Sequence, residues 1–126
     1  MKIKLLIIVI TFFVSLINIS YSADGGGAET PVKSSYDKGA YIVKKAKRLE
    51  KKGKIEKAKV QYKKALKYLL KSNKEKPNKA DTLNYLGFAS RKLGNYEEAE
   101  KYYLDGLKIK PNHNGINEYL GELYIT

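Results

Sequence analysis

The sequence contains no cysteine and no tryptophan, and it has one histidine, one methionine and three prolines among 126 residues. Without cysteine, disulfide bonds, thiolate metal sites and a lipid-modified N-terminal cysteine are excluded. His113 lies in a polar turn where we expect it to be exposed, and no partner for a general base is indicated. The glycines at 25–27 lack the Lys-Ser/Thr of a phosphate loop. The sequence therefore predicts no enzyme, no cofactor and no metal site.

The first 22 residues have the pattern of a secretory signal peptide. Lys2 and Lys4 precede an apolar run from Leu5 to Ile19, and Ser22 follows at a small-residue cleavage site. A run of about 15 residues is shorter than the roughly 20 that span a bilayer, which favours cleavage after Ser22 over an uncleaved anchor. We expect a periplasmic or secreted protein that meets a membrane only through this segment, before cleavage.

Residues 23–35 are predicted to form a flexible linker before a helical domain at 36–126. Three consecutive glycines, Pro31 and small polar residues offer almost no apolar surface for packing. From about Tyr36 the composition changes to lysines interspersed with apolar residues, and this change marks the expected domain boundary.

A helix–turn–helix pattern lies between Pro77 and Pro111, which are 34 residues apart. Apolar or small residues recur at helical spacing before and after Gly94, which suits a left-handed turn between two helices. Asn95 and Glu98 predict a capping box at the start of the second helix. The residues that define the pattern are Leu83, Leu86, Gly87, Ser90, Gly94, Ala99, Tyr103 and Pro111.

This pattern resembles the tetratricopeptide repeat of exported bacterial proteins, with Leu83 in place of the repeat's Trp and Ser90 in place of its Tyr. The resemblance implies an all-α fold, a right-handed superhelical stack of antiparallel helix pairs. Such stacks commonly bind extended peptides or partner helices along the inner wall formed by the first helices. The resemblance therefore implies a scaffold for protein–protein interaction, with a protein or peptide as partner.

The sequence predicts about two and a half repeats. Residues 53–66 match residues 94–107 at an offset of 41, and residues 118–121 match residues 84–87 at an offset of 34. We therefore expect repeat 1 at about 39–76, with a longer second helix and a polar loop at 72–76, repeat 2 at about 77–111 and a partial repeat 3 at about 112–126. Leu120 and Leu123 then lack a covering helix. Either this sequence is a fragment of a longer protein, or another chain supplies the missing helix, which could include self-association through the unpaired helix.

Acidic residues are scarce, with 13 against 25 basic ones, and the formal net charge is +12. Because the lysines occur along all the predicted helices, we interpret the excess first as a solvated surface. An alternative function is a basic adaptor for anionic cell-wall or membrane polymers. No nucleic-acid-binding motif is present, and no nucleic acid is expected. The densest basic cluster is Lys44, Lys45, Lys47, Arg48, Lys51, Lys52 and Lys54.

The resemblance assigns the groove-facing positions of the first helices. Phe88 has two interpretations: it anchors a ligand, or a neighbouring unit buries it. Some repeats of this family grip a C-terminal carboxylate, but of the corresponding positions here only Lys47 is basic, so that clamp is not supported. The predicted partner-binding residues are Val43, Lys47, Asp81, Asn84, Phe88, Arg91, Glu118 and Glu122.

Overall fold

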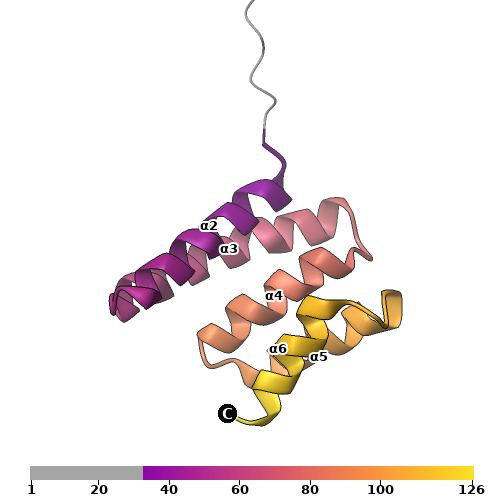
Figure 1. Cartoon of the computed structure of the whole chain (residues 1–126). Coiled ribbons are helices and arrows are strands. Elements are labelled where there is room, and N and C mark those ends of the chain that lie inside the picture. The colour runs from indigo at the N-terminus through magenta and orange to yellow at the C-terminus, as the bar shows by residue number, and fades with distance from the viewer. Residues whose placement is uncertain (1–32) are drawn as a thin grey trace, which may run out of the picture. The chain divides into compact units, whose positions relative to one another are not determined.

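The computed structural model describes residues 33–126, and this part of the chain contains five α-helices and no strand (Figure 1). The helices are α2 (Ser35–Lys51), α3 (Ile55–Glu75), α4 (Ala80–Lys92), α5 (Tyr96–Ile109) and α6 (Asn114–Tyr124). Each helix packs against the next one along the chain, and α4 also contacts α2 and α6. The predicted all-α stack of helix pairs is confirmed. The predicted signal peptide and most of the predicted linker lie outside the described residues.

Helix α2 begins within the predicted linker, at Ser35, because its start is capped. The backbone N–H of Asp37 donates to the Ser34 hydroxyl oxygen at 3.1 Å, and the Ser34 N–H donates to the Asp37 carboxylate at 3.2 Å. This reciprocal pair satisfies two backbone donors that the first turn of a helix leaves free. The hydrogen bond from the Ser34 side chain holds the pKa of Asp37 below its ordinary value.

The turn between α4 and α5 is built as predicted at Gly94 but not at Asn95. Gly94 has φ +84°, a left-handed conformation that a residue without Cβ adopts at little cost. Asn95 has φ −86° and ψ 69° rather than the extended conformation of a capping residue, and its side chain makes no cap hydrogen bond. The Glu98 carboxylate instead accepts from the Tyr102 hydroxyl at 3.1 Å. The predicted capping box is therefore wrong.

Helix α3 is longer than predicted. It continues to Glu75, so the polar loop expected at 72–76 is helical in all but its last residue. The reason is that Ser72 is buried, and the backbone carbonyl of this residue accepts the Lys76 N–H at 2.8 Å. Packing of the last turn against its neighbours thus outweighs the low apolar content of the segment.

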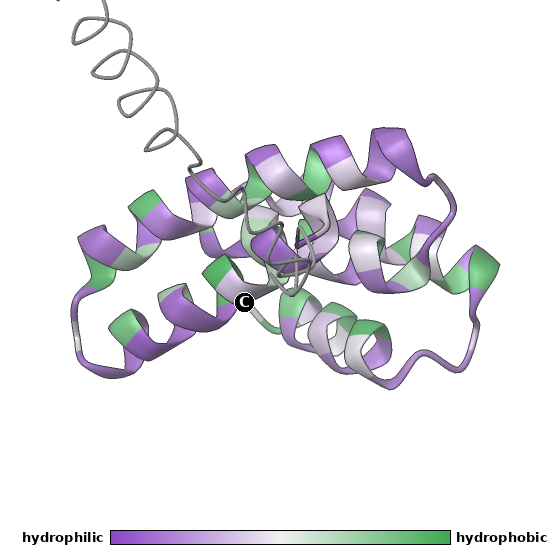
Figure 2. Ribbon diagram, turned by 90° about the horizontal axis from the view of Figure 1, so that it is seen from above, coloured by the Kyte–Doolittle hydropathy of each residue, from purple (hydrophilic) through white to green (hydrophobic). Residues whose placement is uncertain are grey.

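The interior consists of two hydrophobic clusters that share α4. The first joins residues of α2 and α3 to Leu86, Phe88 and Ala89 of α4, and the second joins Ala80 of α4 to residues of α5 and α6. The helices are amphipathic, with hydrophilic and hydrophobic stretches alternating along each ribbon (Figure 2). Each helix pair therefore completes its core with the first helix of the following unit, which is how stacked repeats bury apolar surface.

The crossing of α4 and α5 is tight at Gly87, as its position in the repeat pattern predicts. A Cβ atom at Gly87 would lie 2.5 Å from Cε1 of Tyr103, closer than carbon atoms approach in proteins. Tyr103 is fully buried in the second cluster, so its ring has no free space to move into. The absence of a side chain at position 87 is what lets the aromatic ring lie against the α4 backbone.

No helix among residues 33–126 combines the length and the apolar composition needed to cross a membrane.

Candidate functional site

A shallow depression of about 330 Å³ lies along the first helices of the three units. We call it the inner depression. Helices α2, α4 and α6 each contribute three side chains to it, at positions three and four residues apart, which lie on one face of a helix. Its lining residues are Lys47, Glu50, Lys51, Phe88, Arg91, Lys92, Glu118, Tyr119 and Glu122.

The floor of the inner depression is aromatic. The Phe88 ring lies between Tyr119, at a centroid distance of 4.7 Å, and Tyr62, at 5.9 Å and in an edge-to-face arrangement. Only 3% of Phe88 is exposed, so the neighbouring units bury it and it belongs to the core. Of its two interpretations, burial by a neighbouring unit is therefore the one that the structure has.

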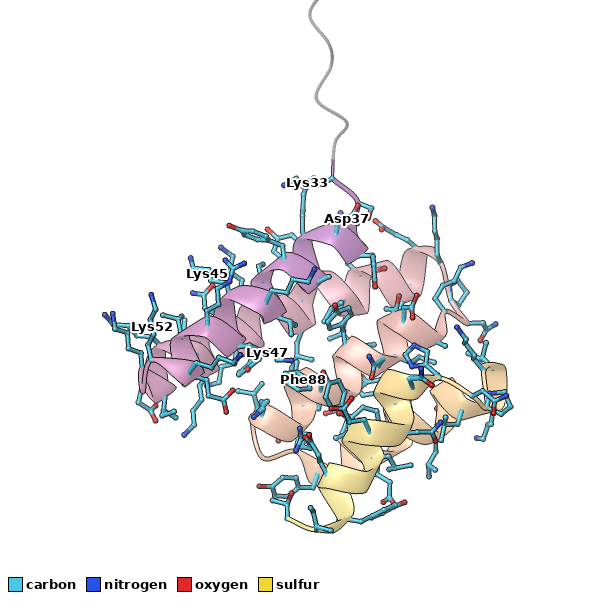
Figure 3. All side chains as sticks on the ribbon, viewed as in Figure 1. Lys33, Asp37, Lys45, Lys47, Lys52 and Phe88 are labelled. Carbon is cyan, nitrogen blue, oxygen red and sulfur yellow. The ribbon has the colours of Figure 1, made fainter. Side chains whose placement is uncertain are left out.

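Cations surround this aromatic floor. The Lys47 ammonium lies 4.9 Å from the centre of the Phe88 ring, and the Arg91 guanidinium and the Lys92 ammonium each lie 5.6 Å from it. Figure 3 shows Lys47 on the side of α2 that faces Phe88. The Lys47 ammonium also donates to the Tyr119 hydroxyl at 3.3 Å. Cations at these distances are attracted to the face of the ring, and they make the rim of the depression partly basic.

Two carboxylates balance two of these cations. Arg91 forms a salt bridge with Glu122, which ties α4 to α6. Lys92 pairs with Glu50 at 2.7 Å, which ties α4 to α2, and the Tyr62 hydroxyl donates to the same carboxylate at 2.9 Å. Partial burial acts to raise the pKa of Glu50, but the hydrogen bonds from Lys92 and Tyr62 outweigh it and hold this pKa below its ordinary value. The depression therefore has a fixed internal ion-pair network.

Two lining residues remain open to a partner. Lys51 and Glu118 are exposed, and within residues 33–126 neither is in a salt bridge. Lys51 is on α2 and Glu118 is on α6, so the two ends of the depression carry opposite available charges. No group of three or more His, Asp or Glu side chains in the described part of the chain could hold a metal ion. The inner depression offers an aromatic floor with hydrogen-bond donors and acceptors around it. This arrangement suits the non-covalent binding of a partner.

Comparison with known proteins supports the repeat pattern. Residues 80–113, which span α4, α5 and the turn before α6, match the family model of the tetratricopeptide repeat. These residues are similar to a tetratricopeptide repeat. The matched residues include those that pack α4 on α5, namely Gly87, Ala99 and Tyr103. A comparison with curated protein sequences finds no match.

One solved structure with a similar arrangement of helices is the first tetratricopeptide-repeat domain of Spaghetti (RPAP3) bound to the HSP90 peptide SRMEEVD. The sequences are 17% identical, the TM-score is 0.46, and the aligned region covers 75% of this chain and 96% of that one. A likeness at this level says nothing about what the repeats of this chain bind.

The stack of helices brings five of the eight predicted partner-binding residues together in the inner depression: Lys47, Phe88, Arg91, Glu118 and Glu122. Val43 is not among them, because it is 1% exposed and belongs to the first hydrophobic cluster. Val43 has almost no surface to offer a partner.

Asp81 and Asn84 lie at the junction between the second and third helical units. The Asp81 carboxylate lies 2.7 Å from Nε2 of His113, and Nδ1 of the same ring accepts the Ile116 N–H at 3.1 Å. The Asn84 amide lies beside Gly115, close enough that a Cβ there would be 2.9 Å from Nδ2. His113 is therefore a buried cap of α6, and the prediction of an exposed turn residue is wrong because Asp81 and α6 enclose it.

The prediction missed some lining residues of the inner depression for which the sequence contained a signal. Lys92 lies four residues after Phe88, and Lys51 lies four residues after Lys47, so helical periodicity places each on the same face as a predicted residue. Tyr119 corresponds to Tyr85 at the repeat offset of 34. Helical spacing of three or four residues from Lys47, Phe88 and Glu122 would have found Lys51, Lys92 and Tyr119.

Proposed function

We propose that this chain is a non-enzymatic interaction module that binds an extended protein segment in the inner depression. The observation that carries the proposal is the convergence of side chains from α2, α4 and α6 on one open surface with an aromatic floor. A peptide lying across three successive first helices can contact all of them at once. Tyr119, which is half-buried at this surface, can supply aromatic contact area to a partner, and the charged rim can select which partner binds.

The free charges suggest the kind of segment that fits. Arg91 and Lys92 already have carboxylate partners, so a ligand gains little by pairing with them. Lys51 and Glu118 are exposed at opposite ends of the depression. We expect a segment with an acidic side chain near α2 and a basic side chain near α6.

Site-specific photo-crosslinking tests the proposal. A photo-reactive amino acid in place of Glu118, at the rim, is compared in the native host with one in place of Lys101, an exposed residue of α5 outside the depression. We expect a discrete crosslinked partner at position 118 and none, or a diffuse background, at position 101. Equal crosslinking at both positions, or none at position 118 over a range of growth conditions, would refute the proposal.

A charge-reversal experiment then tests the orientation of the segment. Lys51→Glu with Glu118→Lys changes no net charge and alters only exposed side chains, so folding should be unaffected. Loss of the crosslinked partner in this variant would support the assignment of acidic and basic ends, and undiminished capture would refute it.

We also propose that the protein is exported to the periplasm or the medium. The proposal is supported by the sequence pattern of residues 1–22, with Lys2 and Lys4 before the apolar run. N-terminal sequencing of the protein recovered from the host tests it directly. A mature N-terminus at Ala23 supports export, whereas a protein that starts at Met1 and stays inside the cell refutes it.

A further inference from the structure

The positive charge of this chain is concentrated in its first helix pair. Residues 33–76 contain 17 basic and 4 acidic residues, a net charge of +13, whereas residues 77–126 contain 6 basic and 7 acidic residues, a net charge of −1. The expectation that the excess is spread along all the helices is therefore wrong. A uniform bias in composition would raise the lysine content of both halves, so the asymmetry indicates a local cause.

The lysines lie on an outer face of the pair that is opposite to the inner depression. Figure 3 shows Lys45 and Lys52 on the outer side of α2, whereas Lys47 is directed toward Phe88. The Lys38 ammonium lies 6.0 Å from the centre of the Tyr68 ring, so this side of α2 adjoins α3. There Tyr68 and a run of α3 residues line a second hollow of about 490 Å³. We call this surface the basic face; it consists of Lys38, Lys45, Lys52, Val60, Lys63, Lys64, Lys67 and Tyr68.

The four acidic residues of the helix pair do not neutralise the basic face. Asp37 caps α2 through Ser34, and Glu50 is directed into the inner depression, where it binds Lys92. Glu56 and Glu75 pair with Lys59 and Lys71, near the two ends of α3. None of the lysines that make up the basic face is in a salt bridge within the described residues.

The chemistry of the basic face fits a broad anionic surface better than a small ligand. Of the 17 basic residues, 16 are lysines and one is Arg48, and a lysine acts as a mobile point charge without the fixed geometry by which arginine selects single phosphates or carboxylates. The 21 residues of α3 extend over about 31 Å at 1.5 Å per residue, so the charges are dispersed. Val60, which is 62% exposed, lies among them and can enter the apolar edge of a headgroup layer.

We propose that the basic face binds the surface of a membrane that contains anionic phospholipids. This proposal specifies the alternative of a basic adaptor for anionic polymers as contact with a lipid surface, in addition to any contact through the N-terminal segment. It is independent of the function of the inner depression. Lysines within a Debye length of a negatively charged bilayer are attracted to it without forming fixed pairs. Bound in this way, the protein would keep the inner depression, on the opposite side of α2, accessible to a partner.

Vesicle sedimentation with the full chain tests the proposal. The vesicles are pure phosphatidylcholine or phosphatidylcholine mixed with phosphatidylglycerol, so that any binding by the apolar N-terminal run appears as a common baseline. A variant of the basic face, Lys45→Gln/Lys52→Gln/Lys64→Gln/Lys67→Gln, is compared with a control of equal charge change, Lys79→Gln/Lys101→Gln/Lys108→Gln/Lys110→Gln. All eight lysines are exposed. Circular dichroism would check that both variants fold.

Wild-type protein and the control should bind the anionic vesicles at least about tenfold more tightly than the basic-face variant, since each lysine near such a surface contributes a factor of about five. The difference should vanish in 1 M salt, where the screening length falls to about 3 Å. Equal loss of binding in the two variants would overturn the proposal, because it would reflect net charge alone. Tighter binding to a short DNA duplex than to the vesicles, abolished by the basic-face substitutions, would also overturn it in favour of a nucleic-acid partner.

Discussion

The tight crossing at Gly87 gives a prediction whose size follows from the structure. In Gly87→Ala the new Cβ would meet Cε1, Cδ1 and Cζ of Tyr103 at 2.5, 2.7 and 2.9 Å. A rigid, fully buried ring cannot rotate away, so the helices must separate or the ring must shift, and overpacking of this kind costs up to about 3 kcal/mol. Replacing glycine by alanine within a helix stabilises the folded protein by about 1 kcal/mol, which offsets part of this cost. The expected net loss of stability is about 2 kcal/mol.

The matched control is Gly121→Ala, at the same repeat position 34 residues later. Nothing lies within 4 Å of a Cβ built at Gly121, so this substitution should be neutral or stabilise the protein by up to about 1 kcal/mol. Urea and thermal unfolding, followed by circular dichroism, would give both values, and a 2 kcal/mol loss lowers Tm by about 8 to 16 °C in a domain of this size. If the two variants differed by less than about 1 kcal/mol, the packing described for α4 on α5 would be refuted.

Three further substitutions test buried and half-buried side chains. Phe88→Ala should destabilise the protein by about 3 to 5 kcal/mol in thermal unfolding, as loss of a core ring does; a small loss would contradict burial. Glu50→Gln should lower the free energy of unfolding by about 1 to 2 kcal/mol near neutral pH, because the charged hydrogen bond with Lys92 is lost. Folding lowers the pKa of Glu50 below 4.5, so the ionised carboxylate stabilises the folded protein above that pH, and this stabilisation is lost as the pH falls through the folded pKa. The free energy of unfolding of Glu50→Gln, measured in urea, should therefore depend less on pH in that range than that of the wild type. His113→Ala should lower the free energy of unfolding in urea by about 1 to 2 kcal/mol, because the Ile116 N–H loses its hydrogen-bond acceptor and Asp81 loses its partner. His113→Asn should recover part of this loss, since asparagine can also cap a helix. Equal stabilities of the Ala and Asn variants would exclude the capping role.

The helix pairs and their turns were predictable because they depend on short-range patterns. The spacing of Leu83, Leu86 and Ala99 follows from helical periodicity, and Gly94 was recognisable because a left-handed turn favours a residue without Cβ. The same register brought Lys47, Phe88 and Glu122 to the inner depression, since these residues, at offsets of 41 and 34, hold equal repeat positions on equivalent faces of successive first helices.

The errors concern contacts that only the assembled stack defines. Val43 has the register of a groove residue, yet the helices around α2 cover it, and periodicity alone does not distinguish these outcomes. His113 looked like a turn residue because its partner Asp81 is 32 residues earlier in the sequence. Asn95 has a suitable side chain for a cap, but its backbone dihedral angles depend on how the turn closes. Burial, long-range pairing and turn geometry therefore had to come from the structure.

The pattern of helix contacts has a consequence for how the chain folds and opens. Most contacts join each helix to the next one in sequence, so little chain must be closed into loops before packing begins, and chains of this kind fold within microseconds to milliseconds. Packing is uneven, being most extensive between α2 and α3 and sparse between α5 and α6. The stack should therefore open stepwise from α6, with backbone amides there exchanging their hydrogens faster than those of the first pair in native-state exchange experiments.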